Sequence, residues 1–160
     1  SEWGQRIALT HKDQLQFIDV ALQHMYGPGD SPSKFTTHVI HSCLRNEATL
    51  KLSAGTQKRD FIYIADVLSA YRTLINKASE LPAFERIELG SGVAPTVREY
   101  VELAKKLTNS STNLLFGEIP FRPGEAMLCV ADNSRLNELG WHPNYSLEQG
   151  LLATIKQERI

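Results

Sequence analysis

The sequence has little of several features that would assign a protein to a class at once. Its 160 residues include two cysteines, Cys43 and Cys129, and neither belongs to a Cys-x-x-Cys pair, which argues against a zinc or other metal site. We therefore expect two buried free thiols in a reducing compartment. There is no run of about 18 apolar residues and no apolar signal-peptide core, so we expect no membrane partner and a cytoplasmic location.

An excess of charge of either sign is also missing. The 17 Lys and Arg residues and 18 Asp and Glu residues give a net charge of −1, whereas dedicated nucleic-acid binders carry a basic excess. We therefore expect no nucleic-acid partner. With 42% hydrophobic and 22% charged residues and a mean hydropathy of −0.25, the composition excludes disordered, collagen-like and coiled-coil chains. The length suits one domain with its own core.

What the sequence does contain is an alternation of strand and helix patterns, which is typical of an α/β fold with a mainly parallel sheet. Strand patterns cover 16–25, 49–53, 59–64, 86–89, 113–118 and 126–130. The first of these is apolar on both faces, as in strands buried within parallel sheets. Helix patterns cover 2–12 and 33–46 and follow Asp66, Thr96, Asp132 and Ser146.

Helix start signals accompany most of these helix patterns. Ser33, Asp66 and Asp132 are predicted N-caps. Thr96 with Glu99, and Ser146 with Gln149, have the spacing of capping boxes. The pattern at 2–12 has no start signal before it, and we therefore expect the sequence to begin partway through a larger unit.

Several segments taken together resemble the C-terminal half of the extended short-chain dehydrogenase/reductase family, in its subgroup of NAD-dependent epimerases and dehydratases of nucleotide sugars. They occur in the family's order: HMYGPGD (24–30), GTQKRDFIYIADV (55–67), LGSG (89–92), TVREYV (96–101), FRPGE (121–125) and NELGWHPNYSLEQGL (137–151). The resemblance implies the C-terminal part of a Rossmann-like parallel sheet plus a smaller α/β substrate-binding lobe. Residues 1–30 would end the Rossmann-like lobe, and 31–160 would form mainly the nucleotide-sugar-binding lobe, with 59–92 partly returning to the first.

Two motifs of that family do not occur in the sequence. The glycine-rich dinucleotide fingerprint is missing, and no tyrosine is followed four positions later by lysine. We therefore expect the chain to be about half of a larger enzyme, with no catalytic residue of its own and no activity alone.

The resemblance implies a substrate diphosphate bound by two arginines. Arg59 and Arg122 match family arginines that contact the diphosphate, and a guanidinium can bind such groups in bidentate fashion. The alternative for Arg59 is a solvated charge or a pair with Asp60. Pro123 and Gly124 predict a tight turn after Arg122.

The remaining candidate substrate contacts come from three separate segments. Glu125 stands where an acidic residue can accept hydrogen bonds from ribose hydroxyls, or it is a turn carboxylate without a ligand. His24 occupies the position of an asparagine that contacts the sugar or phosphate in many relatives, or it is a core histidine. By the same resemblance, the strand with Lys51, Leu52 and Ser53 would hold the nucleotide base.

The segment Met25, Tyr26, Gly27 and Pro28 matches the family's chain near the nicotinamide and the sugar, so these residues are the expected cofactor contacts. Gly27 would allow close approach of a ligand. The alternative is a plain structural turn. Asp60, Tyr63 and Asp66 are interpreted as scaffolding.

The resemblance implies an enzyme that uses NAD or NADP and a nucleotide-diphosphate sugar, and that epimerises, dehydrates or reduces the sugar as a homodimer when full length. The segment HMYGPGD, which has histidine at position 24, favours bacterial deoxysugar enzymes that act on CDP- or dTDP-linked sugars. The alternative is a non-catalytic nucleotide-sugar-binding module or subunit.

Overall fold

The computed structural model describes residues 2–12 and 14–158 of the chain. Its helices are α1 (Glu2–Thr10), α2 (Phe35–Leu44), α3 (Ile64–Asn76), α4 (Val97–Thr108), α5 (Ser134–Glu138) and α6 (Leu147–Glu158), with a 3-10 turn at Ala78–Glu80. The strands are β1 (Phe17–Leu22), β2 (His24–Tyr26), β3 (Thr49–Leu52), β4 (Lys58–Arg59), β5 (Phe61–Tyr63), β6 (Phe84–Leu89), β7 (Asn113–Phe116) and β8 (Leu128–Cys129).

The strands pair in parallel, in the combinations β1–β6, β2–β5, β3–β7 and β4–β8. Parallel partners need a crossover between them, and at least one helix lies between the two strands of each of these four pairs along the chain. This arrangement confirms the α/β fold class predicted from the alternating pattern.

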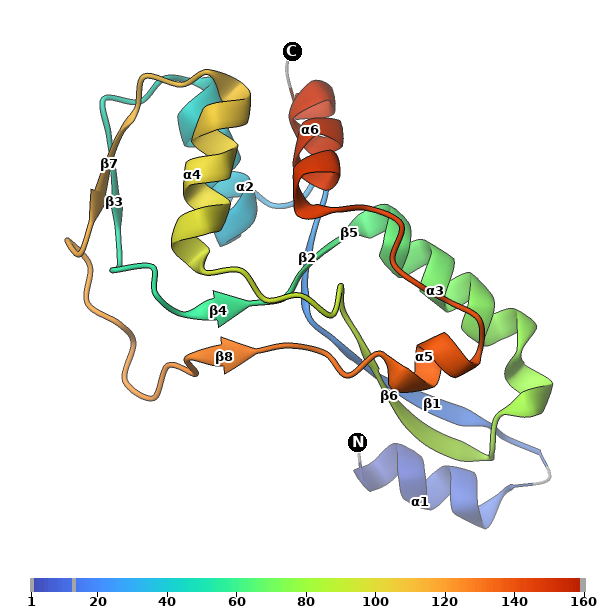
Figure 1. Cartoon of the computed structure of the whole chain (residues 1–160). Coiled ribbons are helices and arrows are strands. Elements are labelled where there is room, and N and C mark those ends of the chain that lie inside the picture. The colour runs from blue at the N-terminus through green and yellow to red at the C-terminus, as the bar shows by residue number, and fades with distance from the viewer. Residues whose placement is uncertain (1, 13, 159–160) are drawn as a thin grey trace.

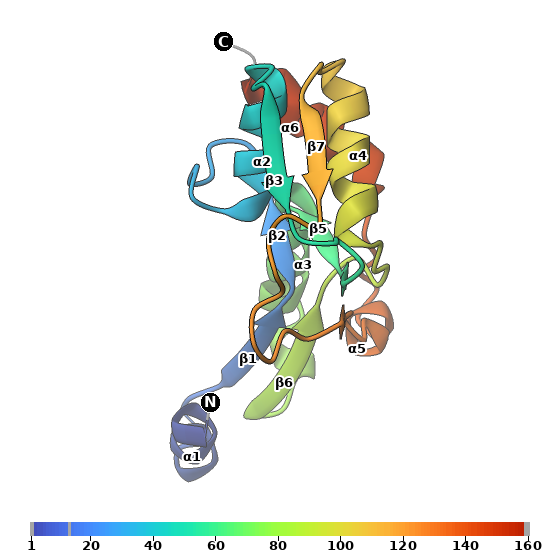
Figure 2. The same ribbon diagram turned by 90° about the vertical axis from the view of Figure 1, so that its left-hand side faces the viewer.

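The molecule is elongated, and the four strand pairs follow one another along it (Figure 1). At one end β3 and β7 lie beside α4, α2 and α6, and at the other end β1 and β6 lie near α1, α3 and α5. The pair β4–β8 lies between these groups. Figure 2 shows β3 and β7 side by side, with their ends directed toward the centre of the molecule.

Two hydrophobic clusters form the core. One centres on Tyr26 and Tyr100, with buried residues from α2, α4, α6 and β3. The other centres on Ile87 and Leu89 of β6 and includes Trp141, with residues from α3 and α5. Because β5 contributes Phe61 and Tyr63 to the first cluster and Ile62 to the second, its alternating side chains join them.

Two of the predicted strands are each divided in the structure, and the reason is the same in both. The strand expected at 16–25 breaks at Gln23, where the chain leaves its partner β6 and begins to pair with β5. The strand expected at 59–64 breaks at Asp60, where the chain passes from β8 to β2. The residues of β1 are half-buried or exposed, not buried on both faces as its apolar pattern predicts.

Both predicted capping boxes are confirmed. The Glu99 amide donates to the Thr96 hydroxyl at 3.1 Å, and the Thr96 amide donates to the Glu99 carboxylate at 2.6 Å. The Ser146 amide donates to the Gln149 side-chain oxygen at 2.8 Å, and the Gln149 amide to the Ser146 hydroxyl at 3.2 Å. Such reciprocal pairs need only local geometry, which is why their spacing is predictive.

The predictions of single N-cap residues at Ser33, Asp66 and Asp132 were wrong. Lys34, not Ser33, precedes α2. Asp66 lies inside the first turn of α3, where its carboxylate accepts the amides of Asn144 and Tyr145 at 2.9 and 3.1 Å. Asp132 lies one residue before the N-cap of α5, and its carboxylate accepts from Ser134. Asp66 therefore holds the segment that leads into α6 instead of capping α3.

Both cysteines are free thiols, as predicted. Cys43 is buried, and its desolvation raises the pKa of the thiol. Cys129 is half-buried, so the expectation that both thiols are buried holds for Cys43 alone.

Candidate functional site

The shortest polar contact of the predicted site residues joins Arg59 to Glu125. Arg59 ends β4, is only 7% exposed, and donates from Nη2 to the Glu125 carboxylate at 2.7 Å. Its Nη1 donates to the Lys58 carbonyl at 2.9 Å. Arg59 is therefore neither a solvated charge nor the partner of Asp60, which were the alternatives considered from the sequence. Two residues 66 positions apart, both selected from the sequence, meet in one ion pair.

A tight turn carries both Arg122 and Glu125. The Glu125 amide donates to the Arg122 carbonyl at 3.0 Å, and Gly124 has a φ of 74°. Proline at the second position and a left-handed glycine at the third are typical of a type II turn, which confirms the turn predicted here. Glu125 is half-buried against Arg59, whereas Arg122 is exposed. The turn therefore places Arg122 at the surface, three residues before Glu125, whose carboxylate pairs with Arg59.

Asp60 fixes the backbone behind this ion pair. Its carboxylate is fully buried and accepts from the Ser91 amide and hydroxyl, both at 2.6 Å, and from the amides of Gly92 and Ala131 at 3.0 and 3.1 Å. The scaffolding interpretation of Asp60 agrees with these contacts. They tie the start of β5 to the chain that follows β6 and to the chain that follows β8.

His24 begins β2 and lies close to the charged residues of the site. Its amide donates to the Asp60 carbonyl at 3.0 Å, and its ring meets the Phe61 ring edge-on with centroids 6.0 Å apart. The residue is exposed, so it is not an enclosed core histidine. Loss of solvation, and secondarily the charge of Arg59, lowers the pKa of His24, while Asp60 and Glu125 oppose the shift. The shift favours the neutral imidazole, which can donate or accept a hydrogen bond.

The segment expected to contact the cofactor is mostly turned inward. The Tyr26 ring is buried, its hydroxyl donates to the Leu147 carbonyl at 3.3 Å, and burial raises its pKa. A Cβ on Gly27 would lie 2.5 Å from the Ile64 side chain, so close packing on α3 explains this glycine and supports the structural-turn alternative. Met25 and Pro28 are half-buried.

The predicted base-contacting residues are Lys51 and Leu52 of β3 and Ser53, which follows the strand, and their side chains do not share one face. Leu52 lies in the core, and its carbonyl accepts from the amides of Gly117 and Ile119 at 3.0 and 3.1 Å. Lys51 is exposed on the opposite face, and the Ser53 hydroxyl accepts from Gln57 at 3.3 Å. Lys51 and Ser53 therefore present polar side chains, and the backbone carbonyl of Leu52 is already engaged.

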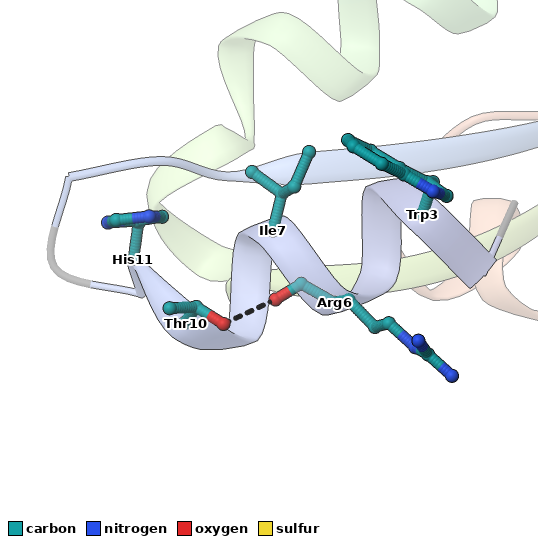
Figure 3. Close-up of a pocket in the computed structure, with 5 residues that line it drawn as sticks. All are labelled: Trp3, Arg6, Ile7, Thr10 and His11. Carbon is teal, nitrogen blue, oxygen red and sulfur yellow. Dashed lines mark hydrogen bonds between the residues drawn. The ribbon is translucent and has the colours of Figure 1, made fainter.

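Among the hollows in the surface of residues 2–12 and 14–158, two of those found lie away from these residues. One, of about 250 Å³, lies along α1, where Trp3, Ile7 and His11 rise from the helix on the same side (Figure 3). Figure 3 also shows Arg6 extending away from that side, with the Thr10 hydroxyl bonded to the Arg6 carbonyl. This hollow contains none of the residues selected from the sequence.

The other hollow, of about 670 Å³, lies between α4 and β7. Its lining includes Arg98, whose guanidinium stacks 3.7 Å from the centre of the Phe116 ring, and the two lysines near the end of α4. None of the predicted site residues lines it either. Sequence reasoning gave no signal for these two surfaces beyond the amphipathic patterns of their helices.

Over the parts of the chain that the structure describes, 2–12 and 14–158, no cluster of three or more His, Cys, Asp or Glu could hold a metal ion. Within the same ranges no helix is long and apolar enough to cross a membrane.

Comparisons with known proteins relate the chain to enzymes of nucleotide sugars. Residues 4–90 match the model of the NAD dependent epimerase/dehydratase family, which confirms the resemblance seen in the sequence. The chain is 31% identical over 158 residues to the CDP-abequose synthase of Salmonella typhimurium, covering 98% of this chain and 52% of that protein. It is 30% identical over 148 residues to the GDP-L-fucose synthase of Escherichia coli, covering 83% of this chain and 46% of that protein.

Solved structures agree. The structure of MoeE5 in complex with UDP-glucose and NAD superposes with a TM-score of 0.84 at 26% identity, over 96% of this chain and 50% of that one. The fold is therefore the Rossmann-like α/β fold of these enzymes. The chain spans about half the length of the relatives that it matches.

Proposed function

The chain belongs to the NAD dependent epimerase/dehydratase family, and from this membership we propose that it forms the nucleotide-sugar-binding portion of an NAD- or NADP-dependent enzyme. The enzyme would epimerise, dehydrate or reduce the sugar of a nucleotide-diphosphate sugar. CDP is our narrower proposal for the nucleotide, because the CDP-abequose synthase matches over nearly the whole chain.

The observation that carries this proposal is the arginine arrangement at the junction of β4 and β8. Arg59 is a buried guanidinium held at 2.7 Å from Glu125, and Arg122 is exposed on the same turn as that carboxylate. Two guanidinium groups give a diphosphate both charge and bidentate geometry. His24 would add a neutral hydrogen-bonding group, and Lys51 and Ser53 would lie along the nucleotide. Because the chain has a net charge of −1 and no basic excess, such a site is better suited to bind a small anion than a long polyanion.

The chain's own residues would bind and orient the substrate. Orientation alone can lower a barrier by about 7–11 kcal/mol. When bound, NAD or NADP would accept and return the hydride. The segment 25–28 fits a wall beside the nicotinamide and not a hydrogen-bonding role for Tyr26, because that hydroxyl is engaged with Leu147. The 160 residues contain no Tyr-x-x-x-Lys, so we propose that this chain alone is inactive.

The second candidate function is a non-catalytic nucleotide-sugar-binding module, which would not need a Tyr-x-x-x-Lys motif. The two candidates differ in the sequence that precedes residue 1 in the full-length protein. A Tyr-x-x-x-Lys motif and a glycine fingerprint there would favour the enzyme, and their absence would favour the module. The cytoplasmic homodimer stays a prediction, to be checked by light scattering of the full-length protein.

Calorimetric titration of the chain with CDP tests the proposal. We expect Arg59→Gln to weaken CDP binding about a hundredfold or more and Arg122→Gln about tenfold, since the first arginine is desolvated and the second is exposed. Arg72→Gln removes an exposed arginine from α3 and is the matched control, with no expected change. Equal affinities in the Arg59 variant and the control would contradict the proposed diphosphate site.

A further inference from the structure

The Arg59 guanidinium already has an anionic partner. Glu125 holds one of its nitrogens at 2.7 Å, and the backbone carbonyl of Lys58 accepts from another. The Arg59 side chain is 9% exposed and the Glu125 side chain 22% exposed, so this pair is shielded from water on most sides. A ligand phosphate that reaches Arg59 must therefore contend with a carboxylate at the same group.

A phosphate and the Glu125 carboxylate on the same guanidinium would repel each other, although the guanidinium has N–H donors besides the one that Glu125 accepts from. Like charges a few ångströms apart destabilise each other, and partial burial reduces the screening that would weaken the effect. A buried guanidinium without any partner is also unfavourable. The carboxylate thus satisfies Arg59 in the ligand-free chain, and a phosphate could take over that role only as the carboxylate leaves.

The segment that carries Glu125 is built so that it can move locally. Residues 117–124 are all exposed, and Gly117 and Gly124 have φ angles of 91° and 74°. The segment is held at its ends, where Ile119 donates to the Leu52 carbonyl and Lys58 donates to the Met127 carbonyl. An exposed segment with few core contacts is among the parts of a protein that open most easily. Local opening of this segment would let the carboxylate leave Arg59 while the backbone bonds at Ile119 and Met127 stay in place.

We propose that Glu125 is an internal counter-ion that occupies the phosphate-binding guanidinium of Arg59 and is displaced when a ligand phosphate binds. The proposal rests on the function proposed above and adds a regulatory element to that site. The affinity of the chain for diphosphates is then set partly by Glu125, and binding of the ligand is coupled to a rearrangement of residues 121–125.

The test uses inorganic pyrophosphate, which has no ribose and so reports on the phosphate-binding groups alone. We expect Glu125→Gln to bind pyrophosphate about tenfold more tightly than the unaltered chain, because the amide cannot compete as an anion. Glu118→Gln removes the same charge from an exposed position on the same segment and is expected to change the affinity less than twofold. Glu125→Asp keeps the charge but draws it back by one methylene, and an intermediate affinity is expected.

Four outcomes decide the matter. Tighter binding in Glu125→Gln, absent in Glu118→Gln and lost when Arg59→Gln is added, supports the proposal. Unchanged or weaker binding in Glu125→Gln overturns it. The proposed function would still stand in that case if Arg59→Gln weakens CDP binding as expected. If Glu125→Gln does not fold, Glu125→Asp decides by the same comparison. If neither CDP nor pyrophosphate binds the unaltered chain, both this proposal and the proposed function fail.

Discussion

Replacing Asp60 by asparagine removes one carboxylate oxygen from the group that fixes the backbone of the site. Oδ1 accepts from the Ser91 amide and hydroxyl, and Oδ2 accepts from the amides of Gly92 and Ala131. An asparagine has one acceptor oxygen and one NH₂ group. In either orientation the NH₂ group therefore faces at least one backbone N–H.

The size of the expected loss of stability follows from the burial of Asp60. Asp60 is fully buried, so water cannot replace the lost acceptor. Leaving one buried donor unsatisfied costs about 1–3 kcal/mol, and replacing charged by neutral hydrogen bonds weakens those that remain. We expect Asp60→Asn to lower the free energy of unfolding by about 3 kcal/mol. With a urea dependence of about 2 kcal/mol per molar, the midpoint would fall by about 1.5 M.

Urea unfolding followed by circular dichroism measures this change, and Asp132→Asn is the matched control. One oxygen of Asp132 accepts both the amide and the hydroxyl of Ser134 at an exposed position, and an asparagine oxygen can accept the same bonds. The control should lose less than about 0.5 kcal/mol. Equal midpoints for the two variants would refute the claim that Asp60 stabilises the site through its buried acceptors.

Two further predictions concern packing and pH. Gly27→Ala should lower the free energy of unfolding by about 1–3 kcal/mol, because its Cβ would lie 2.5 Å from Ile64, and adding Ile64→Ala should weaken this effect in a double-mutant cycle by urea unfolding. Bonds from the Gly29 amide and from His41 hold the pKa of Glu158 below its ordinary value of 4.5. A lowered carboxylate pKa stabilises the fold above its unfolded-state value, and that stability is lost as pH falls through the folded-state pKa. The unaltered chain should therefore exceed Glu158→Gln in free energy of unfolding by the largest amount near pH 7, and this difference should shrink by about pH 3. Urea unfolding at several pH values measures it. A difference that does not change with pH would contradict the assignment.

The local features of the fold could be predicted from the sequence, and those that depend on distant partners could not. The capping boxes at Thr96 and Ser146 close within four residues, so their spacing is sufficient. Asp66 looks the same as a cap in sequence, but its acceptors serve amides 78 and 79 residues away. The breaks at Gln23 and Asp60 likewise arise because each strand changes its partner there, which is a property of the assembled sheet.

In the candidate site, too, local features could be predicted from the sequence, and contacts between distant segments could not. The resemblance selected Arg59 and Glu125 separately, and the turn after Arg122 followed from Pro-Gly chemistry. The ion pair between Arg59 and Glu125 was not predicted, because it depends on the parallel pairing of β4 with β8. The four bonds of Asp60 also come from segments more than 30 residues away.

We propose that a nucleotide diphosphate binds at Arg59 and Arg122, beside the paired strands β4 and β8. The most direct measurement is a titration of the isotope-labelled chain with CDP, followed by nuclear magnetic resonance of the backbone amides and arginine side chains. We expect the chemical-shift changes to concentrate at residues 24–28, 51–53, 59 and 121–125. Shifts that concentrate instead along α1, or in the hollow lined by Arg98 and Phe116, would contradict it.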